Sequence, residues 1–171
     1  GIFRINNDKV VVYDQIFNSS KKNFHRIRMS KSGVIWILGD GYLCSFNGEK
    51  VNYYESDSLN ISGGNSGLLP LDDGNVLFGG SGLRMLIVED NSFKFKTLDP
   101  VGWVNGIAYT KDGNIIYSNA SELIVMKNFK KIGAHNQENG FIFDVPTTVF
   151  IDHRGWIWSA HESGGVGYYN G

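Results

Sequence analysis

Short apolar runs alternate with glycine-rich polar turns along the whole 171-residue chain, and one turn pattern recurs. A glycine preceded by polar residues leads directly into an apolar run at four places: Gly33, Gly74, Gly113 and Gly155. The spacings between these glycines are 41, 39 and 42 residues. A period near 40 residues is typical of repeat architectures, and it is stronger evidence for the fold than the secondary-structure propensities of individual residues.

The positions around these glycines repeat as well. Apolar residues stand two positions after each glycine: Ile35, Val76, Ile115 and Ile157. The residues three positions after it are Trp36, Leu77, Ile116 and Trp158. The residues six positions before it are Ile27, Leu68, Ile107 and Val149. The run after the glycine is apolar on both faces, which indicates a strand buried on both sides, whereas the run before it alternates and indicates one buried face.

Each glycine thus lies between two apolar runs, and further apolar segments follow them along the chain. Each repeat unit is therefore predicted to contain four short antiparallel strands, named A to D in chain order. This arrangement is the signature of a β-propeller blade, and the predicted fold class is all-β with less than about 10% helix. The glycine is expected in the A–B turn, where φ is positive and a Cβ would be disfavoured. Asp152, Asp72 and Ser30 can hydrogen-bond the turn backbone.

The two ends of the chain resemble incomplete blades. Residues 1–14 resemble strands C and D, and the last apolar run resembles a strand C. Two strands, three blades of four and three more strands give 17, whereas a closed four-bladed ring needs 16. We therefore expect a segment of a larger, seven-bladed propeller, with units at 1–20, 21–60, 61–100, 101–140 and 141–171.

Composition narrows the class of protein. Aromatic residues make up 13% of the chain, and 22 glycines against three prolines suit a β protein with many turns. The net charge of -1 offers no electrostatic case for nucleic acid. The single cysteine, Cys44, excludes an internal disulfide framework and a multi-cysteine zinc site. No cofactor is predicted, and no apolar run approaches the roughly 20 residues that span a bilayer.

The stretch TTVFIDHRGWIWSAHESGGVGYYNG (147–171) resembles the two-component regulator propeller repeat. That repeat has a hydrophobic strand, then D-x-x-G-x-x-W-x-x-T, and later G-G, a hydrophobic residue and an aromatic one. The matching residues are Asp152, Gly155, Trp158, Gly164, Gly165 and Tyr168. The stretch RIRMSKSGVIWILGDGYLCSFNG matches through Gly33, Trp36, Gly41 and Phe46. The units at Gly74 and Gly113 keep the turn but lack the tryptophan.

This resemblance implies the sensor region of a bacterial, Bacteroidetes-type hybrid two-component histidine kinase, which takes part in signal transduction. It implies a periplasmic or extracellular portion of an inner-membrane protein, with carbohydrate sensing as the role. The implied partners are an oligosaccharide or protein ligand, the remaining blades of the same chain and a second copy in a homodimer. Contact with a membrane is expected through other parts of the protein, and nucleic acid is not an expected partner.

Ligand sites of propellers commonly lie where the B–C loops and the D–A connections meet at one rim. The position eight residues before each turn glycine is polar in all four units: His25, Ser66, Asn105 and Thr147. His161 and Glu162 add ionisable groups in the last B–C loop, and Trp103 could stack on a sugar ring. These seven residues are the candidate ligand-binding set. The alternatives are that the polar column caps strand ends and that Trp103 is buried between blades.

No catalytic residue is predicted, because the sequence has no nucleophile elbow, P-loop or H-E-x-x-H motif. His161 and Glu162 are adjacent and would point in different directions, so no metal site is predicted. A non-enzymatic sensor is favoured over two alternatives, a propeller enzyme (polysaccharide lyase or glycoside hydrolase) and a protein-binding scaffold. Hydrolysis normally needs two facing carboxylates, and few acids, among them Asp40 and Glu162, lie near the predicted rim.

The repeat tryptophans have a predicted structural role. Trp36 and Trp158 are expected to fill the wedge between neighbouring blades, where a large aromatic side chain buries much surface. The turn glycines at 33, 74, 113 and 155, together with Asp152, are expected to fix the hairpins.

Overall fold

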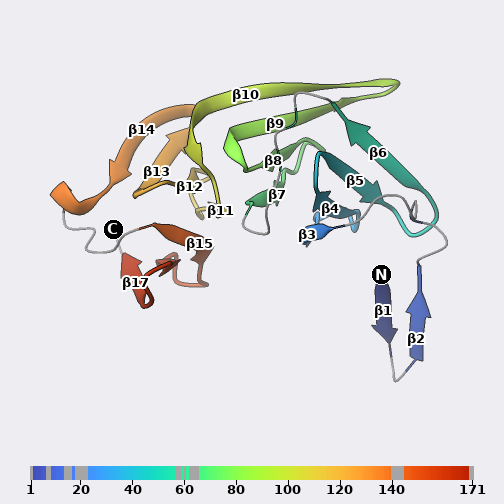
Figure 1. Cartoon of the computed structure of the whole chain (residues 1–171), viewed down its shortest axis with the longest axis horizontal. Coiled ribbons are helices and arrows are strands. Elements are labelled where there is room, and N and C mark those ends of the chain that lie inside the picture. Colours follow the sequence, from blue (N-terminus) through green and yellow to red (C-terminus); the bar gives the residue numbers. More distant parts are fainter. Residues whose placement is uncertain are drawn as a thin grey trace.

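The computed structural model describes residues 2–6, 9–13, 17, 23–56, 59, 61, 66–139 and 145–169. Within these residues the chain consists of antiparallel sheets and one short 3-10 helix, η1 (Gln137–Asn139). The larger sheets are arranged around an axis as propeller blades (Figure 1). The predicted all-β propeller fold is therefore confirmed.

Each blade is a meander of consecutive strands. A two-stranded sheet pairs β1 (Phe3–Asn6) with β2 (Lys9–Val12). The first blade contains β3 (Phe24–Met29), β4 (Ile35–Gly39), β5 (Tyr42–Phe46) and β6 (Val51–Glu55). The second blade contains β7 (Leu68–Pro70), β8 (Val76–Phe78), β9 (Ser81–Glu89) and β10 (Ser92–Trp103). The third blade contains β11 (Ile107–Tyr109), β12 (Ile115–Asn119), β13 (Glu122–Lys127) and β14 (Lys130–His135). The fourth blade contains β15 (Pro146–Ile151), β16 (Ile157–His161) and β17 (Val166–Tyr169).

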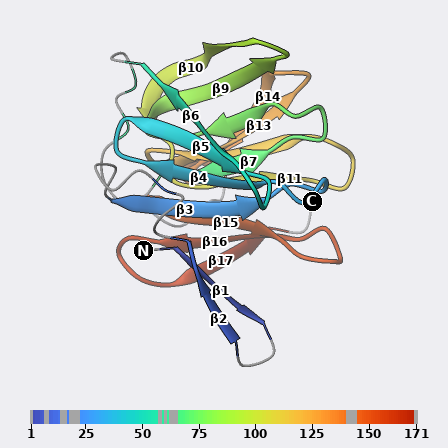
Figure 2. The same ribbon diagram turned by 90° about the vertical axis from the view of Figure 1, so that its right-hand side faces the viewer.

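The first strand of each blade is the innermost one. Strand β7 contacts both β3 and β11, and β11 contacts β15. Strands β6, β10 and β14 lie at the outer edge of the arc (Figure 1). The β1–β2 hairpin projects away from the blades, as the side view in Figure 2 also shows. The inner strands therefore bring the beginnings of four repeats close together.

The second strand of each blade contributes to two hydrophobic interfaces. The residue two positions after the turn glycine faces the preceding sheet: Val76 packs with the first blade, Ile115 with the second and Ile157 with the third. The residue three positions after the glycine faces the following sheet, as Trp36, Leu77 and Ile116 do. This alternation explains why the run is apolar on both faces.

The two repeat tryptophans differ in burial. Trp36 is 5% exposed and packs against the second blade, as predicted. Trp158 is only partly buried, so the prediction that it is buried between blades is wrong. It lies on the face of the fourth blade that points away from the third, where its cross-strand neighbours Phe150 and Tyr168 are 62% and 60% exposed. In the described residues no further sheet packs on this face.

The four glycine turns have the same hydrogen bonds, which confirms their predicted equivalence. In each, the glycine N–H donates to the carbonyl three residues earlier, at 3.0, 3.3, 3.1 and 2.9 Å. All four glycines have positive φ, between 80° and 92°. This geometry is that of a hairpin whose tight turn ends in a left-handed residue, a conformation that glycine adopts without strain.

Polar side chains close these turns. Ser30 Oγ accepts from Val34 N–H at 3.1 Å and Asp152 Oδ1 accepts from Trp156 N–H at 3.0 Å, as predicted. In the second turn Asp73 Oδ1 accepts from Asn75 N–H, whereas Asp72 accepts from Lys31 Nζ of the first blade at 2.6 Å. Neighbouring turns are thereby joined across the blades.

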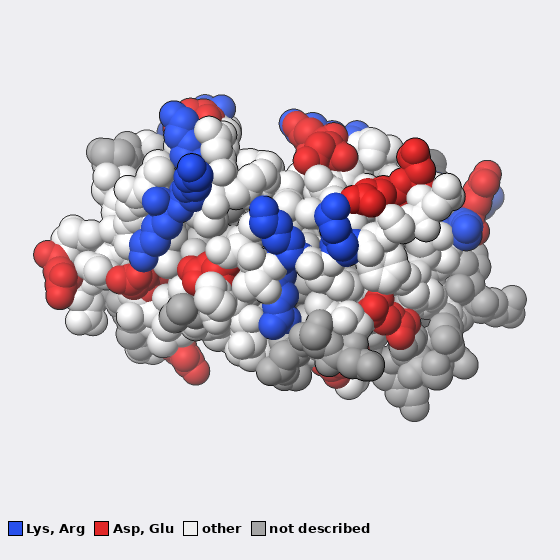
Figure 3. All heavy atoms as spheres, turned by 90° about the horizontal axis from the view of Figure 1, so that it is seen from above, with Lys and Arg blue, Asp and Glu red and all other residues white. Residues whose placement is uncertain are grey.

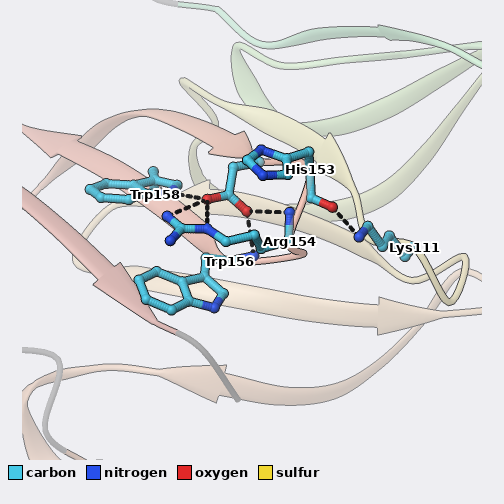
Figure 4. Close-up of polar contacts among 6 residues, drawn as sticks. Lys111, His153, Arg154, Trp156 and Trp158 are labelled. Carbon is cyan, nitrogen blue, oxygen red and sulfur yellow. Dashed lines mark hydrogen bonds and ion pairs between the residues drawn. The ribbon is translucent and has the colours of Figure 1, made fainter.

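The Asp152 carboxylate accepts hydrogen bonds from Arg154, Trp156 and Trp158, the labelled residues around the fourth turn in Figure 4. Its Oδ2 accepts from the Arg154 guanidinium at 3.1 and 3.2 Å and from Trp158 Nε1 at 3.1 Å, and Arg154 lies 3.9 Å from the centroid of the Trp156 ring. Desolvation would raise the pKa of Asp152, but the hydrogen bonds from Trp158, Trp156 and Arg154 outweigh it and hold that pKa below its usual value. Lys111 Nζ donates to the carbonyl of the exposed His153, which links the third and fourth turns.

The outer edge of the arc carries both signs of charge. Viewed from above, Lys and Arg side chains form short stripes with Asp and Glu beside them (Figure 3). Ion pairs at this edge include Lys94 with Glu89 at 2.5 Å and Lys131 with Glu122 at 3.6 Å. Exposed pairs of this kind contribute little to stability.

Candidate functional site

The candidate residues from the sequence lie at the end of the blades opposite the glycine turns. Because the strands are antiparallel, the loops β4–β5, β8–β9, β12–β13 and β16–β17 all lie at this end. The structure places the predicted residues beside these loops: His25, Ser66, Trp103, Asn105, Thr147, His161 and Glu162. We call this end the loop rim. Their side chains have different surroundings, so each group is described in turn.

Ser66 and Asn105 begin the inner edges of the second and third blades, and both are buried, at 0% and 7% exposure. Ser118 Oγ accepts the backbone N–H groups of Asn105 at 3.1 Å and Gly106 at 2.8 Å. Asn105 Nδ2 donates to the Pro146 carbonyl at 3.3 Å, which ties the third blade to the fourth. Ser66 Oγ and Asn105 Oδ1 have no hydrogen-bond partner in the part of the chain that the structure describes.

Glycines allow the inner strands to approach one another at the loop rim. Gly67 N–H donates to the Val104 carbonyl at 3.1 Å, and Gly79 N–H donates to the Gly67 carbonyl at 2.8 Å. A Cβ on Gly106 would lie 2.5 Å from Val149 N, and one on Gly79 would lie 2.0 Å from Val104 O. Since real Cβ atoms do not approach backbone so closely, only glycine fits these positions, and the polar column is held rigidly.

His25 forms a carboxylate–imidazole pair with Asp40. His25 Nε2 lies 2.5 Å from Asp40 Oδ1, and Asn23 Nδ2 donates to Asp40 Oδ2 at 2.8 Å. The His25 side chain is 11% exposed, and it lines a cavity of about 240 Å³ beside Ile2 and Phe3. The sequence indicated both His25 and Asp40 but not their contact, which depends on the pairing of β3 with β4.

The three candidate residues of the fourth blade, Thr147, His161 and Glu162, have different surroundings. His161 is buried and its Nε2 lies 2.8 Å from Ser159 Oγ, whereas Glu162 is exposed. Thr147 Oγ1 donates to the Ala160 carbonyl at 3.2 Å and thereby stabilises the end of the strand pair. No group of three or more His, Cys, Asp or Glu side chains that could hold a metal ion occurs among the described residues.

Trp103 lies at the loop rim where β10 ends, opposite Ser81 of β9. Its side chain is partly buried, and its carbonyl accepts from Ala120 N–H of the next blade at 3.5 Å. Sequence reasoning missed Asn23, Ser118 and Ser159. A small polar residue inside an otherwise apolar second strand, as at Ser118 and Ser159, is the signal that could have found two of them.

The arrangement of blades is that of known propellers. Virginiamycin B lyase from Staphylococcus aureus with quinupristin superposes with a TM-score of 0.65 at 18% identity, over 90% of this chain and 57% of the lyase. The chain described as the extracellular domain of a hybrid two-component system from B. thetaiotaomicron gives a TM-score of 0.65 at 16% identity, over 85% of this chain and 21% of that domain. A gluconolactonase from Xanthomonas campestris gives 0.66 at 11% identity, over 98% and 65%.

These likenesses define a class of fold. The chain has the β-propeller fold, which it shares with the extracellular domain of a hybrid two-component system, with a lyase and with a gluconolactonase. The chain spans little more than half the length of the lyases that it matches. No protein-family model and no curated protein sequence matches it. Among the described residues, no helix has the length and apolar character needed to cross a membrane.

Proposed function

We propose that the chain is an extracytoplasmic ligand-sensing propeller of a hybrid two-component sensor and that its signal is a glycan. The likeness of its fold to the extracellular domain from B. thetaiotaomicron supports the sensor role. In such a protein, histidine kinase activity belongs to other domains, and this chain contributes ligand binding rather than chemistry. The loop rim is the proposed binding surface.

The observation that carries the proposal is the pair of buried oxygen atoms, Ser66 Oγ and Asn105 Oδ1, in neighbouring blades. Buried polar atoms nearly always have a partner, and leaving one unpaired costs roughly 1–3 kcal/mol. Both atoms are closed to solvent, so a ligand reaches them only when neighbouring side chains at the loop rim move aside. A hydroxyl group that then donates to Asn105 Oδ1, and another that bonds to Ser66 Oγ, would recover this free energy. A polyhydroxylated ligand presents such groups in pairs.

The rest of the loop rim supplies complementary chemistry. Glu162 is an exposed hydrogen-bond acceptor, and Trp103 offers an aromatic ring against which the apolar face of a sugar can pack. The close glycine contacts behind Ser66 and Asn105 keep the polar atoms fixed before the ligand arrives, which lowers the entropy cost of binding. A protein ligand could use the same surface, and binding of no glycan would favour it.

A second candidate function rests on the His25–Asp40 pair. A carboxylate that orients an imidazole is a common element of general acid–base catalysis, and His25 lines a cavity. The likeness to a lyase and a gluconolactonase gives this alternative a structural precedent. It predicts turnover of a glycan or lactone that is lost in His25→Ala and in Asp40→Asn, whereas the sensor proposal predicts binding without turnover.

Calorimetric titration of the chain with a panel of neutral oligosaccharides tests the sensor proposal. For a glycan that binds, Ser66→Ala and Asn105→Ala are expected to weaken affinity by about tenfold or more, because each loses a hydrogen bond to a buried atom. Trp103→Ala removes the stacking surface and is also expected to weaken binding.

The chain offers matched controls at the opposite end of the blades. His161→Ala can be compared with His153→Ala, and Trp103→Ala with Trp156→Ala. If the variants in the glycine turns weaken binding as much as those at the loop rim, the loop rim is not the binding surface.

A further inference from the structure

A groove of about 400 Å³ separates β10 of the second blade from β12, β13 and β14 of the third. Its deepest lining is apolar, because Ile124 and Met126 are 1% and 3% exposed. Leu98, Phe129 and five polar or charged side chains line the rest of it. It reaches the β12–β13 loop at Asn119 and Glu122, but it does not include the inner ends of the blades at Ser66 and Asn105. It is thus a separate concave surface.

A bulged strand places Asp99 in this groove. β10 contains 12 residues, and its register against β9 shifts between Thr97 and Asp99 and again between Asp99 and Trp103. Gly82, with φ of 86°, lies opposite, and a Cβ there would be 2.4 Å from Asp99 O. The bulges turn the Asp99 carboxylate toward the third blade, where Oδ2 accepts from Tyr117 Oη at 2.5 Å and from Asn119 Nδ2 at 3.4 Å. Bulges commonly re-aim a side chain beside a functional site.

An aromatic ring lies in an unusual backbone conformation in the lining of the same groove. Asn128 and Phe129 form the β13–β14 turn with φ of 50° and 59°, a turn that normally takes Asn-Gly. A bulky residue with positive φ is a true outlier, and such strain is concentrated at functional sites. Phe129 is 38% exposed and lines the groove, so its ring is available to a ligand.

The part of the groove formed by β13 and β14 contains an ion pair between Glu122 and Lys131. Glu122 Oε1 accepts from Asn136 Nδ2 at 3.0 Å, and its Oε2 lies 3.6 Å from Lys131 Nζ. The register of β14 against β13 also shifts beside Met126, which is paired with Lys131. With Asp99 and Glu122 negative and Lys131 positive, the lining carries one net negative charge. Burial and the hydrogen bond to Asp99 raise the pKa of Tyr117 above its usual value, which keeps Tyr117 a donor.

We propose that this groove binds a neutral saccharide unit. Planar carboxylate and amide groups such as Asp99, Asn119 and Glu122 suit neighbouring hydroxyl groups, and the Phe129 ring suits the apolar face of a pyranose. The net negative charge disfavours uronic acids and other anions. The site includes neither Ser66 nor Asn105, and a ligand there contacts two blades at once.

Saturation-transfer and chemical-shift NMR on the full chain test the proposal, with glucose, galactose, xylose and N-acetylglucosamine as neutral probes and glucuronate as the anionic probe. At least one neutral sugar is expected to bind, and glucuronate is expected to bind more weakly. Phe129→Gly removes the ring and suits the positive φ, so the variant should fold while losing affinity at least tenfold. Asp99→Asn should lose affinity as well.

A control variant and residue-specific NMR signals show whether the loss of sugar affinity arises in the groove. Phe150→Ala removes an exposed aromatic ring on the fourth blade and should leave binding unchanged. Chemical-shift changes at Ile124, Met126 and Phe129 report on the groove, whereas changes at Ser66 and Asn105 report on the loop rim, so a failure of this site is distinguishable from a failure of the loop rim. The proposal is overturned if no neutral sugar binds, if glucuronate binds best, or if Phe129→Gly and Asp99→Asn retain full affinity.

Discussion

Trp36 and Trp158 occupy the same position of the repeat, three residues after a turn glycine, yet their environments differ. Trp36 is covered by the second blade and packs against the tilted ring of Tyr54, whose centroid lies 5.5 Å away. Trp158 lies on the open face of the fourth blade, beside Tyr168 at 5.3 Å and with its Nε1 bonded to Asp152. The repeat therefore specifies which face of the sheet a side chain occupies, whereas the neighbouring sheet determines how much of that side chain is buried.

The largest effect is expected from Trp36→Ala. Removing this fully covered side chain leaves a cavity between two blades and should lower the free energy of unfolding by about 3–5 kcal/mol. Urea denaturation followed by circular dichroism measures it. A loss below about 1 kcal/mol would mean that the second blade does not pack on Trp36 in solution, because truncating a buried aromatic side chain destabilises a protein by more than this.

A smaller loss is expected where the inner strands approach most closely. Gly106→Ala would place a Cβ 2.5 Å from Val149 N, so the third and fourth blades must move apart, at a cost of roughly 1–3 kcal/mol. Gly133→Ala is the matched control, because a Cβ on Gly133 has no atom within 4 Å. Equal midpoints for the two variants in the same denaturant titration would contradict the close contact near the axis.

Much of the fold follows from local sequence, for a physical reason. The tight turn needs a residue that adopts a positive φ, and each strand needs side chains that alternate between its two faces. Residues close together in the sequence determine both features. The polar column was also predictable at Ser66 and Asn105, where polar residues interrupt an apolar face. The predicted division of the chain into blades, and the expectation of a seven-bladed ring, stay predictions.

The features that escaped prediction depend on contacts between distant strands. The exposure of Trp158 depends on whether another sheet covers it, and the His25–Asp40 contact depends on the pairing of two strands. The groove at Asp99 arises from bulges in β10, whose register only the folded sheet determines. A pattern of apolar and polar residues predicts which face of a strand a side chain occupies, but not which distant strand lies next to it.

Trp158→Ala should lower the free energy of unfolding by only about 1 kcal/mol, much less than Trp36→Ala. The partly exposed ring loses stacking and one hydrogen bond but leaves no enclosed cavity. The same denaturation series as for Trp36→Ala provides the measurement. A loss equal to that of Trp36→Ala would show that another part of the protein covers the fourth blade.

The smallest effect concerns the turn that holds Trp158. The folded-state pKa of Asp152 is lowered, so its stabilising contribution is complete above the ordinary carboxyl pKa of about 3.9 and is lost as the pH falls below it. The difference in melting temperature between the wild type and Asp152→Asn should therefore shrink from pH 7 to pH 3. A difference that stays constant over this range would contradict the role of the ionised carboxylate.

The four tryptophans allow a direct test of the central claim, that a ligand binds at the loop rim, because they lie in three different regions. Trp36 lies between blades, Trp103 at the loop rim, and Trp156 and Trp158 on the outer face of the fourth blade. Their indole N–H signals can be followed by NMR while a binding oligosaccharide is titrated into the chain. If the ligand binds at the loop rim, the Trp103 signal moves and the other three signals do not. Movement of the Trp156 and Trp158 signals with an unchanged Trp103 signal would contradict this claim.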